Sequence, residues 1–179
     1  MDAINRYKMT LTMPSDVEFA LERAFDAPRE LVFRAWTEPK HLSQWYGCVS
    51  QLTKCDVDLT VNGGYRYTMG AAGAQPIGTI FGVYREIAAP ERLVFVNSFS
   101  DAAGGLTRAP FPQLKDLWPL EVLNVMTLTE AGGKTTLMLR GSPINASAEE
   151  RAVYAAHTDS MRQGFGGTFD QLAGFLAKS

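Results

Sequence analysis

Residues that bind metals or form covalent cross-links are scarce in this sequence. Its 179 residues include two cysteines, Cys48 and Cys55, and two histidines, His41 and His157. Two cysteines close together in the chain do not make the disulfide framework that stabilises small secreted proteins. The cysteines and histidines are also too few and wrongly spaced for a structural zinc site. We therefore expect no metal and no other cofactor.

Long apolar runs and clusters of basic residues are also lacking. No segment approaches the roughly eighteen uninterrupted apolar residues of a membrane span, and the first residues lack the apolar stretch of a signal peptide. The net charge is −2, and no Lys/Arg run is present that could bind a phosphate backbone. The sequence thus argues against membranes and nucleic acids as partners, and it favours a cytoplasmic location.

Short catalytic signatures are missing too. The sequence has no Gly-x-Ser-x-Gly elbow, His-Glu-x-x-His pair, phosphate-binding glycine loop or dinucleotide fingerprint. The best acid–base pair that it offers is Glu121 with His157, a hypothesis that depends on the fold bringing the two together. No residue is assigned a catalytic role, and whether the protein is an enzyme stays open.

The composition is that of a folded globular protein. Hydrophobic residues make up 46% of the chain and charged residues 20%, far from the values of disordered chains. The length suits one domain with a core of its own. We expect a polar arm at residues 1–16 and a single domain at residues 17–179.

Alternating apolar and polar residues predict a series of strands joined by short turns. The first strand is expected at residues 17–25, where Phe19 and Leu21 face the same side. Two short helices should follow, one ending near Trp36 and one capped by Thr37. The remaining strands are expected at residues 51–58, 65–69, 77–87, 92–100, 120–130 and 135–141.

The C-terminal part should be helical. Ser147 and Glu150 have the spacing of a capping box, and an apolar stripe continues from Tyr154 to Leu176. Glycines within this stripe, such as Gly164, destabilise a helix by about 1 kcal/mol each relative to alanine. Close approach to the sheet, or a bend beside a ligand, would compensate for this cost.

One connection is much longer than the others. Residues 101–119 contain several glycines and prolines but also Phe111, Leu114, Leu117 and Trp118. Long loops with aromatic content are usually functional. We expect this loop to cover the mouth of a pocket.

Four stretches of the sequence resemble a known family. They are ERAFDAPRELVFRAWTEPKHLSQW, GTIFGVYREIAAPERLVF, VMTLTEAGGKTTLMLR and MRQGFGGTFDQLAGFL, which follow one another from Glu22 to Leu176. They resemble the activator of Hsp90 ATPase homologue 1-like domain family, within the START-like, polyketide-cyclase-like superfamily. The resemblance implies an α+β helix-grip fold (START-like, Bet v 1-like), with a curved antiparallel sheet, two short helices and a long C-terminal helix. In such domains the last helix lies across the concave face of the sheet, above either a packed core or a cavity.

Large aromatic and methionine side chains are frequent in the segments that would enclose this space. Buried Trp and Tyr need partners for their polar tips, and Met adapts to irregular cavities. Packing in the core is the alternative for each of them. The candidate ligand-binding residues are Trp45, Tyr65, Tyr67, Met69, Phe81, Phe95, Trp118, Met126, His157, Met161 and Phe165. Polar candidates are Arg85, Asn97, Glu121, Asn124, Arg140 and His157.

Three functions remain open at this point. The first is binding of a small hydrophobic or aromatic molecule, and the second is a cyclase- or hydrolase-type reaction on an aromatic or polyketide-like substrate. The third is interaction with an Hsp90-type chaperone, which we do not expect, because the co-chaperone carries a second domain for which this chain has no room. A homodimer is compatible with the sequence. Fold resemblance alone cannot choose among these functions.

Overall fold

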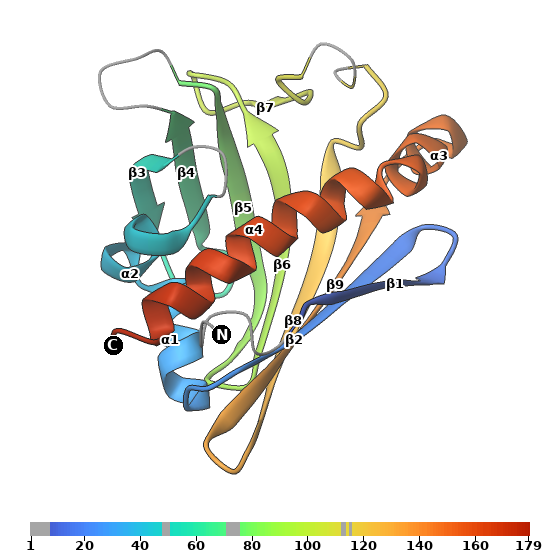
Figure 1. Ribbon diagram of the computed structural model, residues 1–179. Coiled ribbons are helices and arrows are strands. Elements are labelled where there is room, and N and C mark those ends of the chain that lie inside the picture. The colour runs from blue at the N-terminus through green and yellow to red at the C-terminus, as the bar shows by residue number, and fades with distance from the viewer. Residues whose placement is uncertain (1–7, 48–50, 71–75, 112–113, 115) are drawn as a thin grey trace.

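The computed structural model describes residues 8–47, 51–70, 76–111, 114 and 116–179. Its elements follow the order β1, β2, α1, α2, β3 to β9, α3 and α4 (Figure 1). The strands are β1 (Thr10–Ser15), β2 (Glu18–Phe25), β3 (Gln51–Val57), β4 (Gly64–Gly70), β5 (Gly78–Ala88), β6 (Arg92–Ser100), β7 (Leu106–Thr107), β8 (Glu121–Ala131) and β9 (Lys134–Ile144). The helices are α1 (Arg29–Thr37), α2 (Pro39–Trp45), α3 (Ala148–Ala156) and α4 (Thr158–Leu176).

The strands form one antiparallel sheet in the order β1-β2-β9-β8-β6-β5-β4-β3, with β7 paired to β6. Most neighbours in the sheet are also neighbours in sequence, but β2 pairs with β9, and β6 pairs with β8 across the short strand β7. Helix α4 runs across the concave side of this sheet (Figure 1). The α+β helix-grip prediction is confirmed.

The structure differs from the sequence-based expectation at three boundaries. Residues 10–15, expected within a polar arm, form the edge strand β1, whose apolar alternation of Leu11 and Met13 is too short to predict a strand by itself. Thr37 does not cap α2, because it is the last residue of α1 and its hydroxyl donates to the Phe33 carbonyl at 2.9 Å. Glu38 is the N-cap of α2 instead, followed by Pro39 in the first turn.

The third difference is that the C-terminal helix is divided at His157. The capping box of Ser147 and Glu150 is present, but it starts the separate helix α3. His157 leaves the helical conformation, with φ −96° and ψ 15°. Its Nδ1 lies 2.7 Å from the Val153 carbonyl oxygen, and the Thr158 hydroxyl donates to the Ala155 carbonyl at 2.7 Å. These side-chain contacts satisfy carbonyls of the preceding turn and so permit the break.

The core lies between α4 and the strands β2, β8 and β9. Phe25 and Trp36 both meet the ring of Phe169 edge-on, at centroid distances of 6.1 Å and 6.2 Å. Trp45 packs on Trp36 at 5.2 Å, which brings α1 and α2 against the C-terminal half of α4. No helix within the described part of the chain is long and apolar enough to cross a membrane.

Candidate ligand-binding cavity

A cavity of about 400 Å³ lies between the first half of α4 and the neighbouring parts of β4 and β5. Its walls are almost entirely apolar, as is usual for small-molecule sites. Three short segments, the end of α1, the residues after α2 and the loop that follows β7, close its sides. The lining residues are Trp36, Tyr46, Gly47, Met69, Ile77, Ile80, Phe111, Met161, Gly164, Phe165 and Thr168.

Helix α4 contributes one face to the cavity, through residues at helical spacing. Met161, Gly164, Phe165 and Thr168 all line it. A Cβ atom added to Gly164 would meet no other atom within 4 Å, so the cavity lies open in front of this glycine. The Thr168 hydroxyl donates to the Gly164 carbonyl at 3.0 Å, so its proton is used within the helix. The helical wall therefore offers apolar contacts to a ligand.

The loop after β7 reaches the rim of the cavity through Phe111, whose ring meets that of Phe99 edge-on at 6.2 Å. Arg108 ties this loop to helix α3, because its guanidinium donates to the Trp118 carbonyl at 3.2 Å and to the Glu150 carboxylate. The hydrogen bond from Arg108, followed by that from the Ser147 backbone, holds the pKa of Glu150 below its usual value. The expectation that this loop covers the mouth is thus supported at Phe111; residues 112, 113 and 115 lie outside the described residues.

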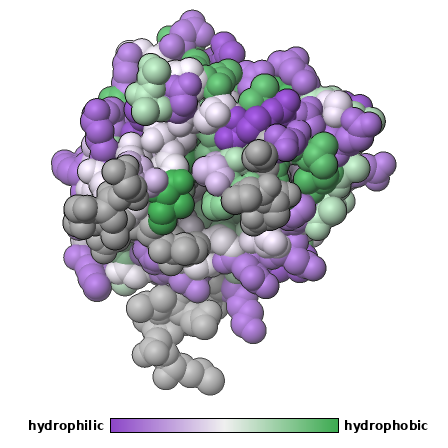
Figure 2. Space-filling model, turned by 90° about the horizontal axis from the view of Figure 1, so that it is seen from above, coloured by the Kyte–Doolittle hydropathy of each residue, from purple (hydrophilic) through white to green (hydrophobic). Residues whose placement is uncertain are grey.

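Several large hydrophobic residues are exposed at the end of the sheet where this loop lies. Figure 2 looks onto that end and shows hydrophobic residues between hydrophilic ones. The exposed residues at the starts of β5 and β8 and in the loop between β6 and β8 are Ile77, Leu106, Phe111, Leu117 and Leu120. Ile77 and Phe111 are both exposed and part of the cavity lining, so the apolar lining of the cavity continues to the surface.

A second, much smaller cavity of about 30 Å³ adjoins the first. Trp36 and Tyr46 line both spaces, and the small one is otherwise enclosed by residues of β4, β5 and β6. Its lining residues are Trp36, Tyr46, Tyr65, Tyr67, Tyr84, Leu93 and Phe95. Tyrosines thus gather at one end of an otherwise apolar site.

Burial keeps the phenols of this cluster protonated. It raises the pKa values of Tyr65 and Tyr67 well above their ordinary value, with smaller contributions from neighbouring tyrosines. Burial also raises the pKa of Tyr84, although a hydrogen bond from Tyr67 opposes this shift. The nearby Cys55 thiol has its pKa raised to about 11, first by burial and then by Asp56. All these groups are neutral at physiological pH.

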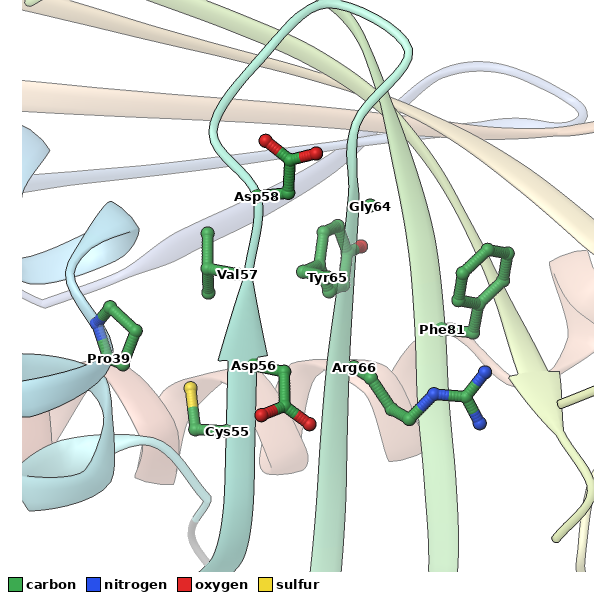
Figure 3. Close-up of a pocket in the computed structure, with 9 residues that line it drawn as sticks. All are labelled: Pro39, Cys55, Asp56, Val57, Asp58, Gly64, Tyr65, Arg66 and Phe81. Carbon is green, nitrogen blue, oxygen red and sulfur yellow. The ribbon is translucent and has the colours of Figure 1, made fainter.

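A broader hollow of about 540 Å³ lies along β3 and β4 at the edge of the sheet (Figure 3). Its charged groups already have partners within the protein. The Arg66 guanidinium donates to the Ser100 hydroxyl at 2.9 Å and lies 5.5 Å from the centre of the Phe81 ring, while Asp58 accepts a hydrogen bond from Thr60 at 2.9 Å. The charged groups in the hollow are therefore explained by contacts within the protein itself.

The structure brings six of the predicted ligand-binding residues to the two adjoining cavities. Met69, Met161 and Phe165 line the large one. Tyr65, Tyr67 and Phe95 line the small one. Direct contact of these residues with a ligand stays a prediction.

The other predicted residues lie elsewhere. Trp45 and Met126 are fully buried in the core, and the Trp45 indole donates to the Ala35 carbonyl at 2.9 Å. Trp118 and His157 pack on one another, at a ring distance of 6.1 Å, beside α3. Phe81 lines the hollow at the sheet edge, next to Arg66.

The polar candidates make contacts within the protein. Asn124 is buried and donates to the side chain of Asn97 and to the Val122 carbonyl. Glu121 accepts a hydrogen bond from Asn145 at 3.0 Å, whereas the hydrogen-bond partner of His157 is the Val153 carbonyl.

The two arginine candidates are exposed. Arg140 pairs with Glu18, and Arg85 lies at the surface of β5.

Sequence reasoning left several residues that line the large cavity out of the candidate set: Trp36, Gly47, Ile77, Ile80, Phe111, Gly164 and Thr168. Some of them carried a signal. Gly164 was conspicuous as a glycine inside a helix, and Phe111 as an aromatic residue in a long loop. Trp36 looked like an inward residue of a helix, and only the fold shows that its other edge borders a cavity. Gly47 has φ +104°, a conformation that favours glycine, at the turn after α2.

The described residues contain no group of three or more His, Cys, Asp or Glu side chains placed to hold a metal ion.

Residues 26–177 match the family model described as activator of Hsp90 ATPase homolog 1-like protein. The chain belongs to this family. The match spans the region from the end of β2 to the end of α4, and so includes every residue that lines the two cavities.

Solved structures with similar folds come from several bacteria. A crystal structure of a Rhodobacter sphaeroides protein has a TM-score of 0.75 and 20% identity, covering 96% of this chain and 100% of its own. A Mycobacterium smegmatis protein has a TM-score of 0.74 and 20% identity, covering 96% and 98%. A solution structure of an Arthrobacter aurescens protein has a TM-score of 0.72 and 19% identity, covering 95% and 92%. At such identities these similarities show the fold alone.

A sequence comparison with curated proteins gave no match.

Proposed function

We propose that this protein binds a small, largely apolar molecule in the cavity beneath α4. The observation that carries the proposal is the cavity itself, whose volume of about 400 Å³ lies within the usual range of small-molecule sites. Its lining of Met69, Ile80, Met161 and Phe165 suits an aliphatic or aromatic ligand. Burial of the ligand's apolar surface would provide most of the binding free energy.

The charge distribution supports a neutral ligand. None of the described residues that line the large cavity carries a charge. A charged group placed there would lose its hydration without gaining an ion pair, which is costly.

The test uses a fluorescent apolar probe, 2-dimethylaminonaphthalene, and the variant Gly164→Phe. Gly164 lines the cavity, and a Cβ atom there would meet no other atom within 4 Å, so a Phe ring at this position should occupy part of the cavity while the variant remains folded. Probe binding should weaken by at least about tenfold. Gly174→Phe is the matched control, since Gly174 lies on the same helix, also has open space in front of it and does not line the cavity. The control should bind the probe within about twofold of wild type. Equal binding by Gly164→Phe and wild type would contradict the proposal, as would failure of wild type to bind.

Native mass spectrometry of the purified protein gives an independent measurement. A copurified molecule that is present in wild type and in Gly174→Phe but absent from Gly164→Phe would identify the class of ligand directly.

A further inference from the structure

The small cavity is surrounded by tyrosines from three separate segments. Tyr65 and Tyr67 come from β4, Tyr84 from β5, and Tyr46 follows α2. The ring centres of Tyr65 and Tyr67 are 4.7 Å apart, those of Tyr65 and Tyr84 are 5.4 Å apart, and those of Tyr46 and Tyr67 are 5.2 Å apart. Four phenols therefore share one compact cluster.

A glycine in β5 makes room for this cluster. Gly82 is the cross-strand partner of Tyr65, and a Cβ atom at residue 82 would lie 2.1 Å from Cζ of Tyr65 and 2.4 Å from its hydroxyl oxygen. The Tyr65 ring thus occupies the space that a side chain at residue 82 would need. This packing directs the Tyr65 hydroxyl over β5, the strand that carries Tyr84.

The cluster can supply hydrogen-bond donors to a ligand. A hydrogen bond joins the side chains of Tyr67 and Tyr84, and because it uses only one of their two phenolic protons, the other can be donated to a further acceptor. Because burial keeps these phenols neutral at physiological pH, they retain the protons needed for donation.

The position of the cluster relates it to the large cavity. Trp36 and Tyr46 border both spaces, so the apolar cavity adjoins a small space that is rich in hydroxyl groups. The small space, at about 30 Å³, exceeds the roughly 10–15 Å³ that one water molecule needs. A single oxygen substituent of a ligand has a comparable size.

We propose that the ligand carries a neutral hydrogen-bond-accepting oxygen, such as a ketone or aldehyde carbonyl, at one end, and that this oxygen is held by the tyrosine cluster. The inference rests on the proposed function, because it assigns an orientation to a ligand in the large cavity. A carboxylate fits less well, since no Lys or Arg is among the described residues that line either space.

Two probes of similar shape test this proposal. 6-Propionyl-2-dimethylaminonaphthalene carries a carbonyl group, and 2-dimethylaminonaphthalene is the same fluorophore without it. Tyr84→Phe and Tyr46→Phe each keep the ring and remove one hydroxyl. At least one of them should weaken binding of the carbonyl probe by about 3- to 10-fold, the range that one hydrogen bond supplies. Binding of the carbonyl-free probe should stay within about twofold of wild type.

A spectroscopic signal separates hydrogen bonding from packing. Emission of the carbonyl probe shifts to longer wavelength when its oxygen accepts a hydrogen bond, so the shift should be present in wild type and reduced in the affected variant. Tyr154→Phe is the control, because this tyrosine is as buried as Tyr84, lies against Phe19 and borders neither cavity. Thermal melts establish that each variant is folded. If either Tyr84→Phe or Tyr46→Phe does not fold, the other variant still tests the proposal.

The outcomes distinguish this proposal from the proposed function. If both probes bind wild type and neither tyrosine variant distinguishes them, the carbonyl inference is wrong while the binding function stands. If neither probe binds wild type, or if Gly164→Phe binds both unchanged, the binding function fails and the inference fails with it. Selective weakening of the carbonyl probe with loss of its emission shift supports both.

Discussion

The two sides of helix α4 differ in how the space beneath them is used. On the side of β2, the ring of Phe169 meets that of Phe25 at a centroid distance of 6.1 Å, and the ring of Phe165, which also borders the cavity, meets that of Phe19 at 5.6 Å. On the side of β4 and β5, the helix presents Gly164, which has no side chain, to the cavity that Ile80 also lines. We call these the filled side and the hollow side. Both sides are apolar, and they differ in that the Phe169 ring packs against Phe25 on the filled side whereas Gly164 leaves open space on the hollow side.

A shift to high pH should have the largest effect on the stability of the fold, and it tests the filled side and the hollow side at once. Burial raises the pKa values of Tyr65, Tyr67 and Tyr84 next to the hollow side and that of Tyr154 next to Phe19. A group whose folded pKa is raised stabilises the fold below its unfolded pKa, and this stabilisation is lost as pH rises further. Stability should therefore fall above about pH 10, the ordinary pKa of tyrosine.

Absorbance at 295 nm and far-UV circular dichroism, recorded over the same pH range, measure this effect. All four tyrosines should ionise together with unfolding. Ionisation of three of them near pH 10 in a folded protein would show that solvent reaches the hollow side and would weaken the comparison.

Truncation of one helical residue on each side should separate the two in stability. Phe169 is fully buried on the filled side, so Phe169→Ala should lower the free energy of unfolding by about 3–5 kcal/mol. Met161 lines the cavity and is only half-buried, so Met161→Ala should cost about 1 kcal/mol. Urea unfolding of both variants gives the difference, and similar losses in the two would show that the hollow side is packed as tightly as the core.

Adding one methyl group on each side should produce opposite signs. Gly141 faces the ring of Phe19, and a Cβ there would lie 2.4 Å from Cζ of that ring, so Gly141→Ala should destabilise the fold by about 1–3 kcal/mol. Gly164→Ala adds its methyl group to open space within a helix and should stabilise by about 0.5–1 kcal/mol. Thermal unfolding of the pair measures both. Destabilisation by Gly164→Ala would mean that the space in front of this residue is already occupied.

Much of the fold could be predicted from local patterns. The alternation in β2 and the capping box at Ser147 and Glu150 depend only on nearby residues, and both are confirmed. The division of the last helix at His157 could not be predicted, because it depends on side-chain contacts to particular carbonyls. Strand β1 was missed for a related reason, since pairing with β2 stabilises a segment whose own pattern is weak.

The candidate site was harder to predict than the fold. Trp45 and Trp36 are both inward-facing tryptophans of short helices, yet Trp45 is enclosed by the core while Trp36 also borders both cavities. Both residues fit an inward position of a short helix, and the sequence does not show which of them has a cavity beside it. The same holds for Phe81, which shares β5 with Ile80 but lines the hollow next to Arg66 at the sheet edge.

The carboxylate of Glu150 has two roles in this protein. It completes the capping box at the start of α3, and it accepts a hydrogen bond from Arg108 in the loop that brings Phe111 to the rim of the cavity. The attachment of the loop to α3 and the capping of the first turn of α3 therefore depend on the same side chain. A substitution at Arg108 would change the charge next to that first turn, and a substitution at Glu150 would remove the hydrogen bond between α3 and the loop, so the rim of the cavity and the start of α3 share one side chain.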